Sequence, residues 1–444
     1  MLYKLNNNIF ICGLLSICMI GCWLNQSALD MMAVGTLLAF ISQMSLILFF
    51  SIEGRNAYSE KTLFIVVFLY SLMLGTVFMT LSYIYEGDTF MLTKADAINY
   101  YNLSMRAHDV GFLPNMAYIA KFYDFDDWGS FAFDSFLMSI IPNKLFLNFV
   151  YMLLGAISSV MLFRICLHYM PNSYAFVAAL SYCTSSFLIL FHCTFLKESL
   201  FTTIIISAMY NLCRFINKES SSALGGLILS VGLLFFFRPA VAAFIIISIF
   251  TFFAIKQHGS ALSLFMYMAG AVIFIIALQY MMTIADRYSA GAVDKLEVSG
   301  NAKAYSGGFN TFVNLFGGFF GPFPTLFTKG GAAPSTLQFY APSLTYRLFL
   351  VFPFFAGLYF VFKKKVLELF PITIFILAEM LASGMVVASL DLRKVMPHIS
   401  FTYIVSFYGL SKWQAEGVGK IIPEVCIYVV AIGIMIMWNI VKKT

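Results

Sequence analysis

Runs of apolar residues, separated by short polar segments, make up most of the chain. Most of these runs are close to the roughly 20 residues that a helix needs to cross a bilayer. Because lipid offers no hydrogen-bond partner to irregular backbone, each run is expected to be an α-helix. The expected helices lie near residues 9–24, 31–52, 62–85, 145–165, 174–195, 198–216, 223–237, 239–255, 261–283, 345–362, 368–390, 396–411 and 421–441.

The pattern predicts an all-α fold: a polytopic integral membrane protein with about 12–14 transmembrane helices, forming a single domain over residues 1–444. The composition agrees, since 61% of the residues are hydrophobic and 11% are charged. A soluble domain usually has about 25% charged residues. This balance excludes a soluble globular enzyme and a disordered protein. The first apolar run lacks a convincing cleavage site, so we expect it to be retained.

Lysine and arginine recur on alternate short loops, which predicts that these loops face the cytoplasm. The residues concerned are Lys4, Arg55, Lys61, Arg164, Arg214, Lys218, Lys256, Lys363, Lys364, Lys365, Lys412 and Lys420. The same count of helices places Lys442 and Lys443 outside, so the sidedness of the C-terminal end stays open. Because topology accounts for the net charge of +6, no nucleic-acid partner is expected.

Two long loops are expected on the outer side, over residues 86–144 and 284–344. The second is rich in Gly and Pro around residues 317–324. Loops of this length are more often functional than idle. The first is acidic, and its eight carboxylates are Glu86, Asp88, Asp96, Asp109, Asp124, Asp126, Asp127 and Asp134.

Several cations lie at the outer ends of the expected helices, where the positive-inside rule does not call for them. These charged residues are Lys197 with its neighbour Glu198, Arg238, Arg347, Arg393 and Lys394. One interpretation is a site for a phosphate-like anion, to which arginine donates paired hydrogen bonds. The other is that each side chain extends to lipid headgroups or pairs locally. Arg238 favours the anion site, because it lies between two short apolar runs and should be sunk below the surface. The following Pro239 suits the start of a helix.

The acidic loop contains candidates for proton transfer and sugar binding. Asp96 or Asp127 is placed to act as a general base toward a hydroxyl group. Tyr100 and Trp128 carry rings of the kind that stack on sugar faces. The alternative interpretation is a solvated acidic loop with aromatic residues at the membrane interface.

The remaining chemistry-bearing residues suggest neither a cofactor nor a metal. His398 lies at the outer start of an expected helix, where it is either a proton carrier or a satisfied polar group. The eight cysteines lie in or beside apolar runs, without metal-ligand or disulfide spacing. There is also no phosphate-binding glycine loop.

Taken in order, the short motifs resemble those of the Wzy-type O-antigen and exopolysaccharide repeat-unit polymerases, which are similar to C-type membrane glycosyltransferases. The resemblance covers about residues 90 to 410. Its motifs are Asp96 to Tyr100, Asp127-Trp-Gly129, Leu196-Lys-Glu198, Phe237-Arg-Pro239, Gly321-Pro-Phe-Pro324 and Leu392-Arg-Lys-Val-Met-Pro397.

The resemblance implies a reaction at the periplasmic face of a bacterial inner membrane. A glycan on undecaprenyl pyrophosphate would be transferred to a sugar hydroxyl of another lipid-linked repeat unit. It implies catalytic roles for Arg238, Asp96 and Asp127, and binding of pyrophosphate or sugar by the other predicted site residues. The implied partners are the undecaprenyl-pyrophosphate-linked oligosaccharide, membrane lipid, a chain-length regulator and a flippase.

Two alternatives stay open. One is a glycosyltransferase that adds single sugars from a polyprenyl-phosphate donor. The other is a flippase or transporter of lipid-linked oligosaccharide. A transporter needs charges along a path that is reachable from both sides, and no internal repeat is found in the sequence.

Overall fold

The computed structural model describes residues 2–24, 31–52, 58–90, 94–257, 260–297, 323–328, 331–332, 335–386, 392–416 and 424–443. The helices of the first half are α1 (Leu2–Leu24), α2 (Met31–Phe50), α3 (Glu60–Glu86), α4 (Lys94–Val110), α5 (Phe112–Phe122), η2 (Phe125–Asp127), α6 (Trp128–Ile140), α7 (Lys144–Leu167), α8 (Asn172–Cys183), α9 (Ser186–Thr194) and α10 (Lys197–Ile216). The later elements are α11 (Ser222–Leu234), α12 (Pro239–Lys256), α13 (Ala261–Glu297), β1 (Phe327–Thr328), β2 (Gly331–Ala332), α15 (Ser335–Lys364), η4 (Leu367–Leu369), α16 (Phe370–Val386), α17 (Leu392–Glu416) and α18 (Glu424–Lys443).

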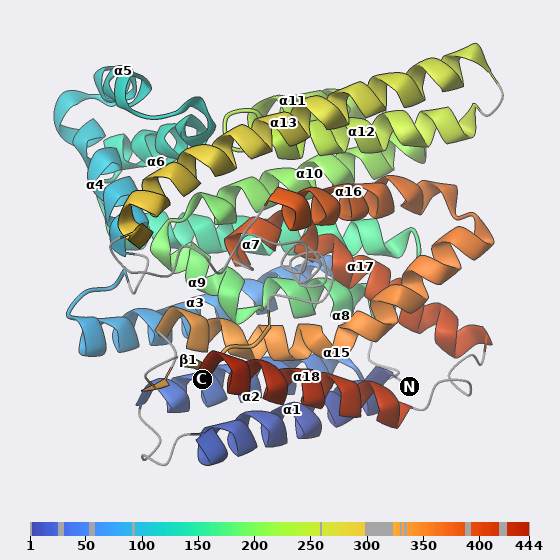
Figure 1. Ribbon diagram of the computed structural model, residues 1–444, viewed down its shortest axis with the longest axis horizontal. Helices are drawn as coiled ribbons and strands as arrows, with labels where there is room; N and C mark the ends of the chain where they lie inside the picture. The colour runs from blue at the N-terminus through green and yellow to red at the C-terminus, as the bar shows by residue number, and fades with distance from the viewer. Residues whose placement is uncertain are drawn as a thin grey trace.

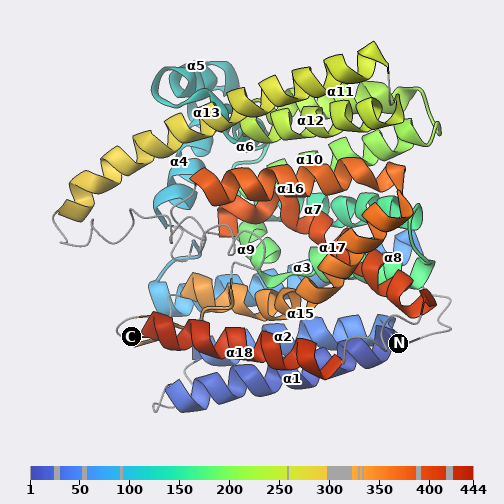
Figure 2. The ribbon, with the colours of Figure 1, turned by 45° about the vertical axis from the view of Figure 1, so that its right-hand side comes forward.

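The long helices lie roughly side by side in layers (Figures 1 and 2). One edge is formed by α1, α2 and α18, and the opposite edge by α11, α12 and α13. The chain is therefore an all-helical polytopic membrane protein, as predicted. The two strands form only a two-residue antiparallel pairing, with Phe327 opposite Ala332.

Helices α4 to α6 gather at one end of the long helices, on the left of Figure 1. We call them, with η2, the α4–α6 unit. The chain leaves this end at the start of α7, so Arg164, the basic residue in the last turn of α7, lies at the opposite end. The two termini also lie at opposite ends (Figure 1).

Seven described helices are long and apolar enough to cross a membrane, or eight if α8 and α9 form one span bent by 45°. The prediction of about 12–14 crossings is higher, although each predicted run contains a helix, or two helices in the case of 174–195. Part of the difference comes from short or polar helices. For example, α11 has 13 residues, about 20 Å at 1.5 Å per residue, and α17 starts with charged residues.

The predicted second loop, residues 284–344, is partly helical at both ends. α13 continues to Glu297, and α15 begins at Ser335. The short segment 323–328 is bound to α18 through Asn439. The side chain of Asn439 donates to the Pro324 carbonyl oxygen at 2.9 Å and accepts from Leu326 N at 2.8 Å. Gly321 and Pro322 of the predicted motif lie outside the described residues.

The α4–α6 unit has a small core of its own. Tyr100, Leu103, Ile119 and Phe131 pack together there. Asn115 of α5 links all three of its α-helices, because its side chain donates to the Leu103 carbonyl oxygen of α4 at 2.8 Å and to Ser135 Oγ of α6 at 3.0 Å. The unit is thus a folded body that can position side chains rather than a loose loop.

Two glycines bring α15 and α17 into close contact. A Cβ added at Gly357 would overlap the backbone of Val405, and one added at Gly409 would overlap the backbone of Pro353 and Gly357. Small residues allow helix backbones in membranes to approach in this way. The crossing fixes the position of α17, whose first turn contributes to the site described next.

Candidate functional site

A sharp turn between α9 and α10 brings a lysine and a glutamate to the start of a helix. Phe195 follows α9 with a φ of 55°, in the left-handed region that bulky residues rarely adopt. Its buried ring packs near the rings of Tyr101 and Tyr151, at centroid distances of 6.0 and 6.3 Å. The surrounding packing sustains the strained backbone. α10 then begins with Lys197 and Glu198.

Lys197 faces the α4–α6 unit. Its Nζ forms an ion pair with Oδ1 of Asp127, and the same oxygen accepts a 3.0 Å hydrogen bond from the Tyr100 hydroxyl. Burial, together with the charge of Asp127, raises the pKa of Tyr100, so this hydroxyl stays protonated and able to donate. The Asp127 side chain is still 22% exposed. Its carboxylate is therefore oriented by two partners yet reachable.

Glu198 faces two arginines from distant parts of the chain. Its Oε1 atom lies 3.0 Å from Nη2 of Arg238 and 3.0 Å from Nε of Arg393. Glu198 is fully buried, whereas the side chains of Arg238 and Arg393 are 23% and 27% exposed. The carboxylate thus binds the two guanidinium groups from the buried side, and the arginines keep accessible surface.

Arg238 is held at the start of α12 by further contacts. It is the N-cap residue, and Pro239 is the first residue of the helix, as the sequence predicts. Its guanidinium carbon lies 4.8 Å from the centroid of the Phe201 ring, a cation–π contact.

Pro397 explains another contact of Arg238. A proline has no N–H, so the carbonyl oxygen four residues earlier in a helix loses its usual donor. Pro397 lies inside α17, and that carbonyl belongs to Arg393. Nη1 of Arg238 donates to it at 3.2 Å. The proline thus leaves the Arg393 carbonyl oxygen without a helical donor, and the Arg238 guanidinium group donates to it instead.

We call Lys197, Arg238 and Arg393 the cation cluster. Two carboxylates, Asp127 and Glu198, lie against it, so these five side chains carry one net positive charge. The cations lie at the N-termini of α10, α12 and α17, which add partial positive charge. This arrangement is suited to bind an anion, and guanidinium groups suit phosphate best.

The other predicted site residues are not part of the cation cluster, or their side chains lie outside the described residues. Asp96 and Lys394 belong to α4 and α17, but their side chains lie outside the described residues. Tyr100 packs 4.7 Å from Phe131, between ring centroids. Nε1 of Trp128 donates to the Tyr123 carbonyl oxygen at 3.0 Å. Both rings contribute to packing within the α4–α6 unit, and their predicted contact with sugar stays a prediction.

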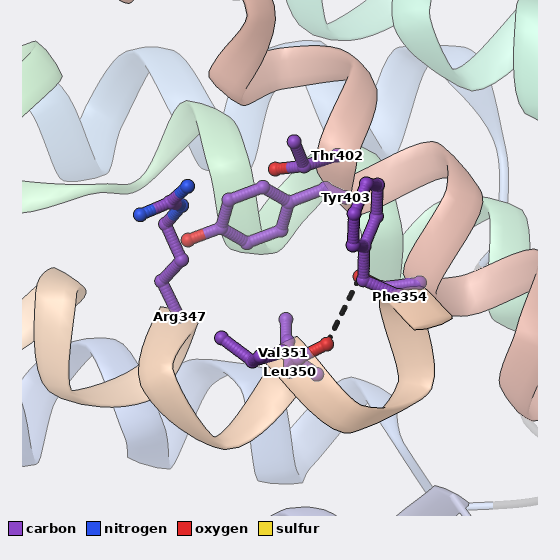
Figure 3. Close-up of a pocket in the computed structure, with 7 residues that line it drawn as sticks. Arg347, Leu350, Val351, Phe354, Thr402 and Tyr403 are labelled. Carbon is purple, nitrogen blue, oxygen red and sulfur yellow. Dashed lines mark hydrogen bonds between the residues drawn. The ribbon is translucent and has the colours of Figure 1, made fainter. Parts of the chain in front are cut away.

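Arg347 does not lie at the start of its helix, as the sequence had suggested. α15 begins ten residues before the expected boundary, at Ser335, so Arg347 lies well inside it. Arg347 is buried and points toward Tyr403, and both line a pocket (Figure 3). Tyr403 lies about 15 Å along α17 from Arg393 at 1.5 Å per residue. None of the described contacts joins Arg347 to the cation cluster, and its binding role stays a prediction.

His398 is fully buried and forms a pair with Glu379 of α16. None of the described contacts connects this pair to the cation cluster. The pair fastens α16 to α17, and a role for His398 toward substrate stays a prediction.

The structure also reveals a buried carboxyl group that sequence reasoning counted as a loop charge. Asp134 of α6 is 1% exposed, and its Oδ1 accepts a 2.8 Å hydrogen bond from the Tyr151 hydroxyl. Burial raises the pKa of Asp134 to about 8. The apolar sequence on both sides of Asp134 was the signal that it belongs to a packed helix.

One comparison with known proteins bears on this site. A family model described as dolichyl-phosphate-mannose-protein mannosyltransferase matches residues 132–282, about a third of the chain. The matched part runs from α6 into α13 and contains Lys197, Glu198 and Arg238. No curated protein and no solved structure matches the chain. The similarity supports a membrane glycosyltransferase of the C type that uses lipid-linked sugars.

Proposed function

We propose that this protein is a repeat-unit polymerase of the bacterial inner membrane. It transfers a glycan from undecaprenyl pyrophosphate to a sugar hydroxyl of another lipid-linked oligosaccharide, with the active site facing the periplasm. The observation that carries the proposal is the cation cluster beside Asp127, at one end of the membrane helices. The leaving group of this reaction is an anion that stays at the membrane boundary.

The described residues suit each part of the transfer. The acceptor oxygen bonds to the anomeric carbon, the bond from that carbon to the phosphate oxygen breaks, and its electron pair stays on the pyrophosphate. Arg238 and Arg393 stabilise the charge that develops there. Asp127 takes up the proton of the acceptor hydroxyl. The α4–α6 unit holds the acceptor sugar beside Asp127.

The match to the mannosyltransferase family favours a second candidate: transfer of a single sugar from a polyprenyl-phosphate donor. The matched segment includes most of the cation cluster. One net positive charge among the five side chains also suits a singly charged phosphodiester.

Surface glycans from cells with and without the protein separate the candidates. Loss of the long-chain ladder, with a single repeat unit retained, supports the polymerase. Accumulation of an incomplete unit supports the single-sugar transferase, and accumulation of complete units inside the cell supports a flippase. A chain-length regulator and a flippase are the partners that we expect for the polymerase.

Purified protein in liposomes gives the direct test. The polymerase should join undecaprenyl-pyrophosphate-linked units without any added protein. Arg164→Ala serves as the matched control for Arg238→Ala. Arg164 pairs with Glu60 at 2.6 Å, away from the cation cluster. Activity on polyprenyl-phosphate sugars alone would overturn the polymerase proposal in favour of the second candidate.

A further inference from the structure

We infer that Glu198 is a positioning residue, which holds Arg238 and Arg393 together and lowers the affinity of the site for free anions. The sequence suggested instead that Glu198 binds substrate. The inference rests on the proposed function for its effect on turnover, but its effect on anion binding does not depend on which glycan is transferred.

The geometry shows why the two arginines need a shared counterion. Nη2 of Arg238 and Nε of Arg393 each lie 3.0 Å from the same oxygen of Glu198. Their nitrogens are therefore no more than about 6 Å apart, a separation at which like charges repel strongly in a buried setting. Without the carboxylate, the two guanidinium groups would separate or draw in another anion.

Burial makes a direct contact between Glu198 and substrate unfavourable. Glu198 is 0% exposed, and its second oxygen, Oε2, is buried without a hydrogen-bond partner among the described residues. A carboxylate also repels a phosphate group. The accessible groups are the arginines, and Arg238 uses only two of its five N–H donors on Glu198 and the Arg393 carbonyl oxygen.

Charge balance gives the inference a distinctive signature. Replacing Glu198 by Gln raises the net charge of the five side chains from one to two positive charges. Free anions should then bind more tightly, while turnover falls because the arginines are no longer fixed. A purely structural residue would lower abundance and weaken binding together.

The experiment measures binding of inorganic pyrophosphate to the purified full chain, alongside kcat and KM for transfer. For Glu198→Gln, we expect pyrophosphate to bind about tenfold more tightly, since one neighbouring negative charge is removed. We expect kcat to fall about 100-fold, on the scale of a lost oxyanion donor. Unchanged or weaker pyrophosphate binding by a folded Glu198→Gln protein would overturn the inference.

Glu198→Asp distinguishes the effect of the negative charge from the effect of side-chain length. It keeps the negative charge but is one methylene shorter, so it cannot contact both arginines in the same way. Pyrophosphate affinity should stay within twofold of the wild-type value, while kcat falls. Full activity in Glu198→Asp would contradict the positioning role.

Two further variants distinguish the proposed effect on the site from misfolding. Glu60→Gln is the matched control, because it also removes the carboxylate partner of an arginine, and neither pyrophosphate binding nor kcat should change. If Glu198→Gln does not fold, the double variant Glu198→Gln, Arg238→Gln should recover folded protein, since the charge excess is gone. Failure of the double variant to recover would oppose the inference. Altered pyrophosphate binding without any glycosyl transfer would support the inference and reject the proposed function.

Discussion

The backbone N–H of Gly129 donates a 2.9 Å hydrogen bond to the carbonyl oxygen of Phe236. This contact joins the start of α6 to the turn that precedes Arg238. The α4–α6 unit and the cation cluster are therefore connected by backbone as well as by the Lys197–Asp127 ion pair. The acceptor side and the anion side of the proposed site keep a fixed separation.

Gly129→Ala should weaken this connection. A Cβ at this position would overlap the ring of Phe237, so the turn carrying Arg238 must move. We expect activity to fall about tenfold, with a stability loss of about 1–3 kcal/mol, typical of overpacking. Gly232→Ala in α11 is the control, because no atom lies within 4 Å of its added Cβ. Equal activity of the two variants would mean that the contact does not position Arg238.

Arg238→Ala should reduce transfer by about 100- to 1000-fold, because it removes charge stabilisation at the leaving group. Membrane insertion should be unaffected. Arg238→Lys should recover only part of the activity, since lysine cannot make paired hydrogen bonds. The measurement is kcat/KM in liposomes. Wild-type activity in Arg238→Ala would contradict an anion site at this position. Full activity in Arg238→Lys would indicate that the positive charge alone matters and that the paired hydrogen bonds do not.

Pro397→Ala should lower the activity without lowering the stability of the fold. Alanine restores an N–H, which competes with Arg238 for the carbonyl oxygen of Arg393. We expect about a tenfold loss of kcat, from a weakened hydrogen bond to a charged group, together with an unchanged or higher melting temperature. Pro342→Ala in α15 is the matched control. There the freed carbonyl, that of Gln338, accepts from Thr36 Oγ1 at 3.4 Å, and the activity should not change.

Asp134 should make stability depend on pH. Its pKa is raised to about 8 in the folded protein, whereas an unfolded aspartate has a pKa of about 3.9. The folded state therefore binds more protons between these values, and stability falls as pH rises, by at most about 1.4 kcal/mol per pH unit. Thermal unfolding in detergent from pH 5 to 8 measures this.

The comparison for that experiment is Asp134→Asn, which cannot ionise. The difference in melting temperature between wild type and this variant should change steadily across the range in favour of the variant at high pH. Asp109→Asn, on the exposed surface of α4, should follow the wild type. A parallel pH profile for wild type and Asp134→Asn would show that Asp134 is already ionised in the folded protein.

The sequence predicted features whose cause is local. The apolar runs predicted the helices. The Arg238-Pro239 pair predicted the start of α12, because proline at a first helical position needs no distant partner. The common place of Lys197, Arg238, Arg347, Arg393 and Lys394 at helix ends predicts that their side chains gather at one face. In the structure Lys197, Arg238 and Arg393 lie together around Asp127 and Glu198, whereas Arg347 lies inside α15.

Features that depend on distant contacts could not be predicted in this way. Glu198 and Arg393 are 195 residues apart, and nothing near either residue specifies the ion pair. Arg347 was misplaced because the polar and proline residues at the start of α15 end the apolar run, although the helix continues through them. The role of Pro397 depends on Arg238, which approaches from another helix.

The crossing of Gly357 and Gly409 has a consequence for how a substrate enters. The proposed substrate carries a polyprenyl tail, which must enter between helices from the surrounding lipid. Where Gly357 and Gly409 meet, α15 and α17 have no room even for an added methyl group. At that crossing the seam is closed to a hydrocarbon chain, so the proposed donor must approach the arginines at another position.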